Sequence, residues 1–162
     1  MGFQTEKQVV RDYYAELDRA EGAEIAKVMQ GYCAPDYLWR GFHPFNEQTS
    51  AQAVAEGFWQ PLRASLTRMQ RRMDIFFAGR NEMDGFQSTW VVSMGHLMGL
   101  FDQDWLGIPP TGKMAFLRYC DFNRVEQGKI TETAMYFDIP HLMTQAGVNP
   151  FPPQTAAHVL QP

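Results

Sequence analysis

Two ionisable side chains in apolar surroundings, Asp121 and His96, are the residues of this sequence best suited to acid–base chemistry. Asp121 lies in a strand-like stretch, LRYCDF, in which alternation puts it on one face with Tyr119. A carboxylate that faces an apolar cavity loses hydration, which raises its pKa toward the range where a general acid or base works well. The alternative is an aspartate paired with Arg118 or Arg124, or one exposed near the strand end.

His96 lies in a second strand-like stretch, WVVSMGHLM. Alternation places it on one face with Trp90, Met94 and Met98, unless Gly95 shifts the register. An imidazole in such a position could donate a proton to a substrate oxygen. The alternative is a core histidine that is hydrogen-bonded to the backbone.

Aromatic residues and methionines are abundant, with 12 Phe, 6 Tyr, 4 Trp and 10 Met. They suit the lining of a cavity, because they bury large areas and adapt to irregular shapes, but they also suit a plain core. Several gather in an expected irregular stretch, residues 34–47, where His43 could gate a pocket mouth. The residues we expect to shape a ligand pocket, with a core role as the alternative, are Trp39, Trp59, Trp90, Tyr119 and Met135.

Metal and phosphate chemistry find little support in the sequence. The four histidines, at positions 43, 96, 141 and 158, are far apart and show no familiar ligand spacing. There is no glycine-rich phosphate-binding pattern and no serine elbow. We therefore expect no metal and no cofactor.

The elements that must position these side chains can be read from the spacing of apolar residues. Helical spacing predicts helices at 5–19, 23–31 and from 49 to about 62, the last kinked or restarted by Pro61. Alternation then predicts strands from about 71, at 86–100, at 114–126 and at 129–137, followed by a short helix at 139–146 that Asp138 caps. Helices followed by four antiparallel strands are typical of the α+β class, here as a curved sheet that encloses an apolar cone.

Length and composition favour one domain spanning residues 1–162, with an irregular proline-rich tail from about 148. The net charge is −4, and the only basic group, Arg63, Arg68, Arg71 and Arg72, is best interpreted as a solvated stretch leading into a strand. We expect no nucleic-acid partner. No apolar stretch is long enough for a membrane span, no signal peptide is evident, and two cysteines form no disulfide framework, so a cytoplasmic location is expected.

Three short motifs, PDY at 35–37, GIPPT at 107–111 and GKI at 128–130, resemble the SnoaL-like polyketide cyclases over roughly residues 5–150. That family has the cone-shaped fold of nuclear transport factor 2, ketosteroid isomerase and scytalone dehydratase. The resemblance implies a pocket for an apolar ketone, cofactor-free acid–base chemistry and a homo-oligomer, with Asp121 facing inward. The family's catalytic Asp and His positions fall on Met135 and Asp121 of this chain, and a thioether cannot exchange a proton.

These observations lead to two main hypotheses. The first is an enzyme of the cyclase, isomerase or lyase (dehydratase) type that acts on a small apolar carbonyl compound, with Asp121 as acid or base and His96 polarising or protonating an oxygen. This hypothesis expects Asp121 and His96 to face each other across one enclosed apolar hollow. The second is a non-catalytic ligand-binding module on the same fold, favoured by Met135 at the family's acid position. In either case we expect a small apolar ligand and a homodimer or higher homo-oligomer. A third hypothesis is a dimerising or partner-binding domain that uses the outer sheet face.

Overall fold

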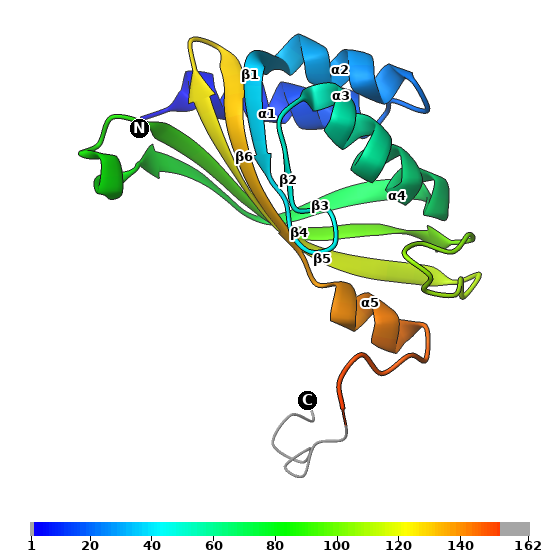
Figure 1. Ribbon diagram of the computed structural model, residues 1–162. Helices are drawn as coiled ribbons and strands as arrows, with labels where there is room; N and C mark the ends of the chain where they lie inside the picture. Colours follow the sequence, from blue (N-terminus) through cyan, green and yellow to red (C-terminus); the bar gives the residue numbers. More distant parts are fainter. Residues whose placement is uncertain (1, 153–162) are drawn as a thin grey trace.

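The computed structural model describes residues 2–152, so most of the predicted tail lies outside the described residues, while residues 148–152 form no helix or strand. The chain begins with two helices, α1 (Gln4–Leu17) and α2 (Glu24–Tyr32). Helix α1 buries Val10, Tyr13, Tyr14 and Leu17 at helical spacing, which turns one stripe toward the sheet. Figure 1 shows both helices on the same side of the strands.

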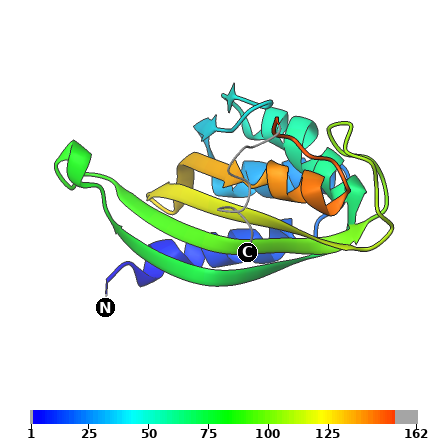
Figure 2. The same cartoon turned by 90° about the horizontal axis from the view of Figure 1, so that it is seen from below.

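The strands form one curved, six-stranded sheet in the order β2-β1-β6-β5-β4-β3. Their bounds are β1 (Cys33–Arg40), β2 (Glu47–Gln48), β3 (Leu66–Arg80), β4 (Thr89–Phe101), β5 (Met114–Glu126) and β6 (Lys129–Phe137), with a 3-10 turn, η2 (Glu82–Asp84), between β3 and β4. Strands β3 to β6 pair antiparallel as predicted, and β1 lies parallel to β6. The α+β architecture is thereby confirmed, and Figure 2 shows how the long β3–β4 hairpin bends along α1.

The prediction of an irregular stretch at 34–47 is wrong for its first half, because residues 33–40 form β1. Pro35 suggested a break, since it cannot donate to a strand ladder. The structure tolerates it where the pairing of β1 with β6 is interrupted, between Cys33 and Leu38. The observed sheet is therefore mixed, whereas four antiparallel strands were expected.

The third predicted helix is a composite of three segments. Helix α3 (Ala51–Val54) begins at Ser50, whose side chain accepts from the Ala53 N–H at 3.1 Å. A π-helical turn, η1 (Ala55–Trp59), follows, and α4 (Gln60–Ser65) starts with Pro61 in its first turn. Proline suits a first turn because that turn needs no N–H donor, so the expected interruption near Pro61 is confirmed.

Helices α1 to α4 cover one face of the sheet, which we call the inner face (Figure 1). The last helix, α5 (Ile139–Gln145), follows β6 and lies beside the start of β5, where the Gln145 side chain bonds the backbone N and O of Phe116 at 2.9 and 2.8 Å. Asp138 caps α5 by accepting from the His141 N–H at 3.1 Å. The opposite, outer face of the sheet carries no helix among the described residues.

The close approach of β3 and β4 at Gly95 leads to a prediction. A Cβ at this position would lie 1.9 Å from the Arg72 carbonyl oxygen, opposite a register shift in β3 between Met73 and Ile75. Gly95→Ala should therefore destabilise the protein by about 1–3 kcal/mol in urea unfolding. Gly79→Ala is the matched control, because no atom lies within 4 Å of its added Cβ. Equal stability of the two variants would contradict the observed packing.

Candidate functional site

The Asp121 carboxyl group lies at the centre of the interface between α1 and the sheet. Its side chain is fully buried, and Oδ2 accepts a hydrogen bond of 2.5 Å from the Tyr14 hydroxyl of α1. The other oxygen, Oδ1, is buried and has no hydrogen-bond partner. The alternatives of pairing with Arg118 or Arg124 and of exposure are wrong, because alternation along β5 sends those two residues to the outer face.

The surroundings of this carboxyl group shift its pKa upward. Burial raises the pKa of Asp121, while the Tyr14 hydrogen bond and the Arg71 charge lower it in part. The pKa of the Tyr14 hydroxyl is raised well above its usual value by burial and then by the neighbouring Asp121 charge. Tyr14 is therefore a donor to Asp121, and the carboxyl group can exchange a proton closer to neutral pH than an exposed aspartate can.

A chain of hydrogen bonds orients the Tyr14–Asp121 pair. The Asn123 amide donates to the Tyr14 hydroxyl at 3.2 Å, and the Thr133 hydroxyl donates to Asn123 Oδ1 at 2.8 Å. All four side chains are buried. Each member satisfies the next, so the Tyr14 proton points to Asp121.

Arg71 of β3 is a functional candidate that the sequence analysis missed. The interpretation of its arginine group as solvated is wrong for this member, whose side chain is 4% exposed. Its Nε and Nη2 donate to the two carboxylate oxygens of Asp18 at 2.8 and 3.0 Å. Its Cζ lies 3.9 Å from the ring centroid of Tyr14 and 5.0 Å from that of Tyr119. One sequence signal could have indicated this position. Arg71 lies in a basic run within a strand of alternating pattern, and alternation turns one member of such a run toward the inner face.

The prediction that His96 faces Asp121 is wrong. In the β4–β5 register, Ser93 lies opposite Asp121 and His96 lies opposite Arg118, which places His96 on the outer face. Its Nδ1 there lies 3.4 Å from Asp74 Oδ2. No shift in register along β4–β5 brings His96 inward, and the inner position opposite the carboxylate belongs to Ser93, which shares a 2.7 Å hydrogen bond with the Tyr119 hydroxyl.

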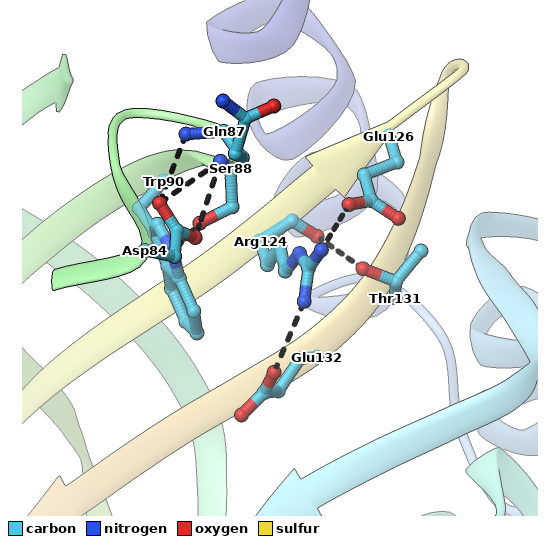
Figure 3. A network of polar contacts seen from close by, with 8 residues as sticks. All are labelled: Asp84, Gln87, Ser88, Trp90, Arg124, Glu126, Thr131 and Glu132. Carbon is cyan, nitrogen blue, oxygen red and sulfur yellow. Dashed lines mark hydrogen bonds and ion pairs between the residues drawn. The ribbon is translucent and has the colours of Figure 1, made fainter. Parts of the chain in front are cut away.

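Trp90 also lies on the outer face, so its expected place in an inner pocket is wrong. Its indole N–H donates to the Ser88 hydroxyl at 2.8 Å, and Asp84 accepts from Ser88 and from the Gln87 N–H (Figure 3). Across the same face, the Arg124 guanidinium pairs with Glu126 and Glu132 (Figure 3). These contacts fix the end of the sheet near the β3–β4 turn.

The other proposed pocket residues divide into core and surface. Trp39, Trp59 and Tyr119 are each 1% exposed and pack in the aromatic core, and His43 is exposed. Met135 is buried and lies opposite Asp121 in the β5–β6 register. The inner face therefore brings together Tyr119, Met135 and Asp121. The Tyr119 ring adjoins the Arg71 guanidinium, and the Asp121 carboxyl group accepts a hydrogen bond from Tyr14.

Two hollows flank the site without reaching the carboxyl group. One, of about 360 Å³, lies where β6 passes into α5. Its lining includes Tyr119 and Phe137 together with outer-face residues, namely Met94, Arg118, Cys120 and Tyr136. The other, of about 480 Å³, lies on the outer face and is lined largely by apolar side chains, among them Phe77, Trp90, Phe122 and Tyr136. Asp121 lines neither hollow, and aromatic side chains such as Trp59 and Phe58 are packed within the interior. The single hollow expected between Asp121 and His96 is excluded, because the two lie on opposite faces.

Among residues 2–152, no group of three or more His, Cys, Asp or Glu side chains could hold a metal ion, and His158 lies outside these residues. No helix in the same range is long and apolar enough to cross a membrane.

Comparison with known proteins places this architecture among polyketide cyclases. The family model of the SnoaL-like polyketide cyclases matches residues 27–146. A search of curated proteins gave no significant match. Among solved structures, AclR of Streptomyces galilaeus, a proposed hydroxylase, is 17% identical with a TM-score of 0.71, covering 97% of this chain and 95% of its own. IdmH of Streptomyces antibioticus, a proposed polyketide cyclase, is 19% identical with a TM-score of 0.65, covering 90% and 100%. At these identities the structures show a shared fold.

Proposed function

Because this chain belongs to the SnoaL-like polyketide cyclase family, we propose that it is a cofactor-free acid–base enzyme for an apolar carbonyl compound. Reactions of the cyclase, isomerase and lyase type share one requirement, the transfer of a proton next to a carbonyl group. Asp121 is the group that takes and returns this proton. The two unpaired cysteines of the chain suit the reducing cytoplasm, where we propose that the protein acts.

The observation that carries this proposal is the state of the Asp121 carboxyl group. One oxygen is held by Tyr14, the other is buried and free, and burial raises its pKa. A buried carboxyl group without a second partner is costly for stability, and such groups concentrate at sites of chemistry. Asp121 also stands where the family resemblance puts a catalytic histidine, directly opposite Met135 in the β5–β6 ladder, so a group that can exchange a proton is present at one of the two family positions.

In the proposed step, Oδ1 of the Asp121 carboxylate takes a proton from the carbon next to the carbonyl. The C–H electron pair forms a C=C bond, and the carbonyl π electrons move to oxygen, giving an enolate. Asp121 then returns the proton to the same or another carbon. Alternatively, the enolate carbon attacks a second carbonyl group, whose π electrons move to its oxygen, and Asp121 gives its proton to the resulting alkoxide. The hollow that Tyr119 and Phe137 help to line is the proposed route inward, because the centroid of the Tyr119 ring lies 5.0 Å from the Arg71 guanidinium carbon.

Deuterium exchange tests this function without knowledge of the natural substrate. We expect the protein in D₂O to accelerate exchange of the α-hydrogens of 2-tetralone and anthrone, followed by NMR. Binding of these ketones, seen by fluorescence quenching, with exchange no faster than in buffer across pH 5 to 9 would instead support the non-catalytic ligand-binding module that Met135 suggests. If the protein neither binds these ketones nor accelerates their exchange, both functions are contradicted.

The proposed partner is a second copy of this chain, bound through the outer sheet face. That face exposes large apolar side chains, chiefly Ile75, Phe77 and Tyr136, with Phe77 53% and Tyr136 54% exposed. Phe116 is exposed as well, beyond the row formed by Arg72, His96 and Arg118. Groups of exposed large apolar side chains on a protein surface mark interaction sites, and a stable interface buries about 800 Å² per partner.

Charge supports a two-fold arrangement of these copies. The end of the face near the β3–β4 turn carries Asp84, Glu126 and Glu132 around Arg124, as Figure 3 shows. The half of the face toward the opposite end carries Arg72 and Arg118, which lie on either side of His96, together with Asp74. A two-fold axis through the centre of the face would set the acidic end of each copy against the basic end of the other, as a self-complementary interface requires.

A charge in the centre of the outer face should separate the copies. We expect Phe77→Glu to convert a dimer into a monomer in sedimentation velocity at micromolar concentration, because the carboxylate would be desolvated without a partner. Met83→Glu is the matched control, since Met83 is 91% exposed on the turn beyond the face and its substitution should leave the dimer intact. A monomeric parent protein, or a Phe77→Glu dimer, would contradict the interface.

A further inference from the structure

Arg71 is a buried guanidinium with one unused nitrogen. Asp18 occupies Nε and Nη2 with both of its carboxylate oxygens, at 2.8 and 3.0 Å. Nη1 is buried and has no hydrogen-bond partner. The aromatic rings of Tyr14, Tyr119 and Trp59 lie around the guanidinium, with their centroids 3.9, 5.0 and 5.8 Å from Cζ. The free N–H donor is therefore held in a fixed plane by one ion pair and three rings.

The free nitrogen of Arg71 and the free oxygen of Asp121 adjoin the same side chain. Tyr14 presents its ring to the guanidinium and its hydroxyl to Asp121 Oδ2. Both Arg71 Nη1 and Asp121 Oδ1 are buried and without a partner. An unsatisfied buried polar group costs about 1–3 kcal/mol, more for a charged one, so two such atoms beside one ring point to a ligand that satisfies them.

We propose that Arg71 binds the carbonyl oxygen of the substrate and stabilises it as an enolate while Asp121 exchanges the adjacent proton. This assignment rests on the function proposed above and names the ligand class as a planar oxyanion, an enolate or a phenolate. In the step, the α-carbon loses its proton to Asp121, the carbonyl oxygen gains the negative charge, and the Arg71 N–H donates to that oxygen. When the proton returns, the charge on oxygen is discharged and the donor is released.

The charges of Asp18, Arg71 and Asp121 indicate the role of each side chain. Asp18 balances the Arg71 charge in the resting protein, so the site is neutral when Asp121 holds its proton. Enolate formation places the new negative charge beside a preorganised donor in a site that excludes water, where such a donor is worth more than in bulk solvent. Asp18 is thus a positioning residue, and Arg71 touches the reacting oxygen.

The preference of the site for an oxyanion can be measured with 2-naphthol, because its neutral and ionised forms have distinct absorption spectra. The measurement uses Asp121→Asn, because an amide at 121 cannot exchange a proton and any ionisation then belongs to the ligand. We expect this variant to bind naphtholate in preference to naphthol. The added Arg71→Met substitution should weaken naphtholate binding about 10- to 100-fold, as for loss of a charged hydrogen bond. Naphthalene, which lacks the oxygen, should bind equally to both.

A further variant separates binding from folding. Asp18→Asn with Arg71→Met and Asp121→Asn removes the buried ion pair as a unit, so that no lone charge remains. It should show the same loss of naphtholate binding as the Arg71→Met variant. Equal naphtholate binding with and without Arg71 would overturn the Arg71 assignment. The proposed function would not be affected by that result, because it depends on ketone exchange by the unmodified protein. Absence of naphtholate binding in Asp121→Asn, with ketone exchange present in the unmodified protein, would also overturn it.

Discussion

Asp121→Asn should lower the rate of ketone α-hydrogen exchange by about 10² to 10⁴-fold, because the amide can neither take nor return a proton. The fold should persist, since the amide oxygen introduced at position 121 can still accept from the Tyr14 hydroxyl that Asp121 now engages at 2.5 Å. The NMR exchange assay with 2-tetralone measures the rate, and thermal unfolding measures stability. A melting temperature within a few degrees of the parent protein, together with lost exchange, is the expected result.

The same substitution should change how stability depends on pH. Because the pKa of Asp121 is raised from 3.8, the folded protein holds this proton where the unfolded chain has released it. The native state then binds more protons than the unfolded state, so stability falls as pH rises from the unfolded pKa through the raised folded one. Asp121→Asn lacks this fall, and its stability relative to the parent protein should increase across that window. Unchanged exchange, or a relative stability that decreases there, would contradict the role.

Phe58→Ala should destabilise the protein by about 3–5 kcal/mol, because removal of the ring leaves a cavity at the centre of the aromatic core. Phe58 is 1% exposed, and its ring lies 5.3 Å from Trp39, 4.9 Å from Trp59 and 5.3 Å from Phe137 between ring centroids. These contacts join the π-helical turn η1 to β1 and to the end of β6. Urea denaturation measures the free energy of unfolding.

Phe151→Ala is the control for this change, since Phe151 is 59% exposed and its loss should cost less than about 0.5 kcal/mol. If Phe58→Ala were as mild as Phe151→Ala, Trp39 and Trp59 would line a preformed hollow, as the sequence suggested, and not a packed core. The expected large effect means that the inner aromatic residues act mainly by packing. Access to Asp121 would then require side chains to move.

The inward position of Asp121 could be predicted from the sequence through the family resemblance, and the outward position of His96 could not. Strand β5 has charged residues at alternate positions, Arg118 and Arg124 among them, which marks its outer face. Strand β4 is apolar on both faces, with Val91 and Leu97 inward and Val92 and Met94 outward. Such a strand gives no sign of which face is inner, and a choice shifted by one residue reverses every side chain.

Charge patterns misled in a different way. Arginine is rarely buried unless it is paired, so a run containing Arg68, Arg71 and Arg72 indicates a solvated segment. The partner that buries Arg71 is Asp18, at the end of α1 and far away in sequence. Long-range pairs of this kind leave no local signal. Pro35 likewise hid β1, since a gap in the β1–β6 ladder is a tertiary feature.

Titration of the Asp121 carboxyl carbon by NMR, with ketone exchange measured over the same pH range, tests most directly whether this residue carries the proton. The Asp121→Asn variant assigns the signal by its absence. We predict a midpoint above 3.8, with the exchange rate rising as Asp121 ionises. A carboxyl group that ionises at or below 3.8, or an exchange rate indifferent to its ionisation, would contradict the account.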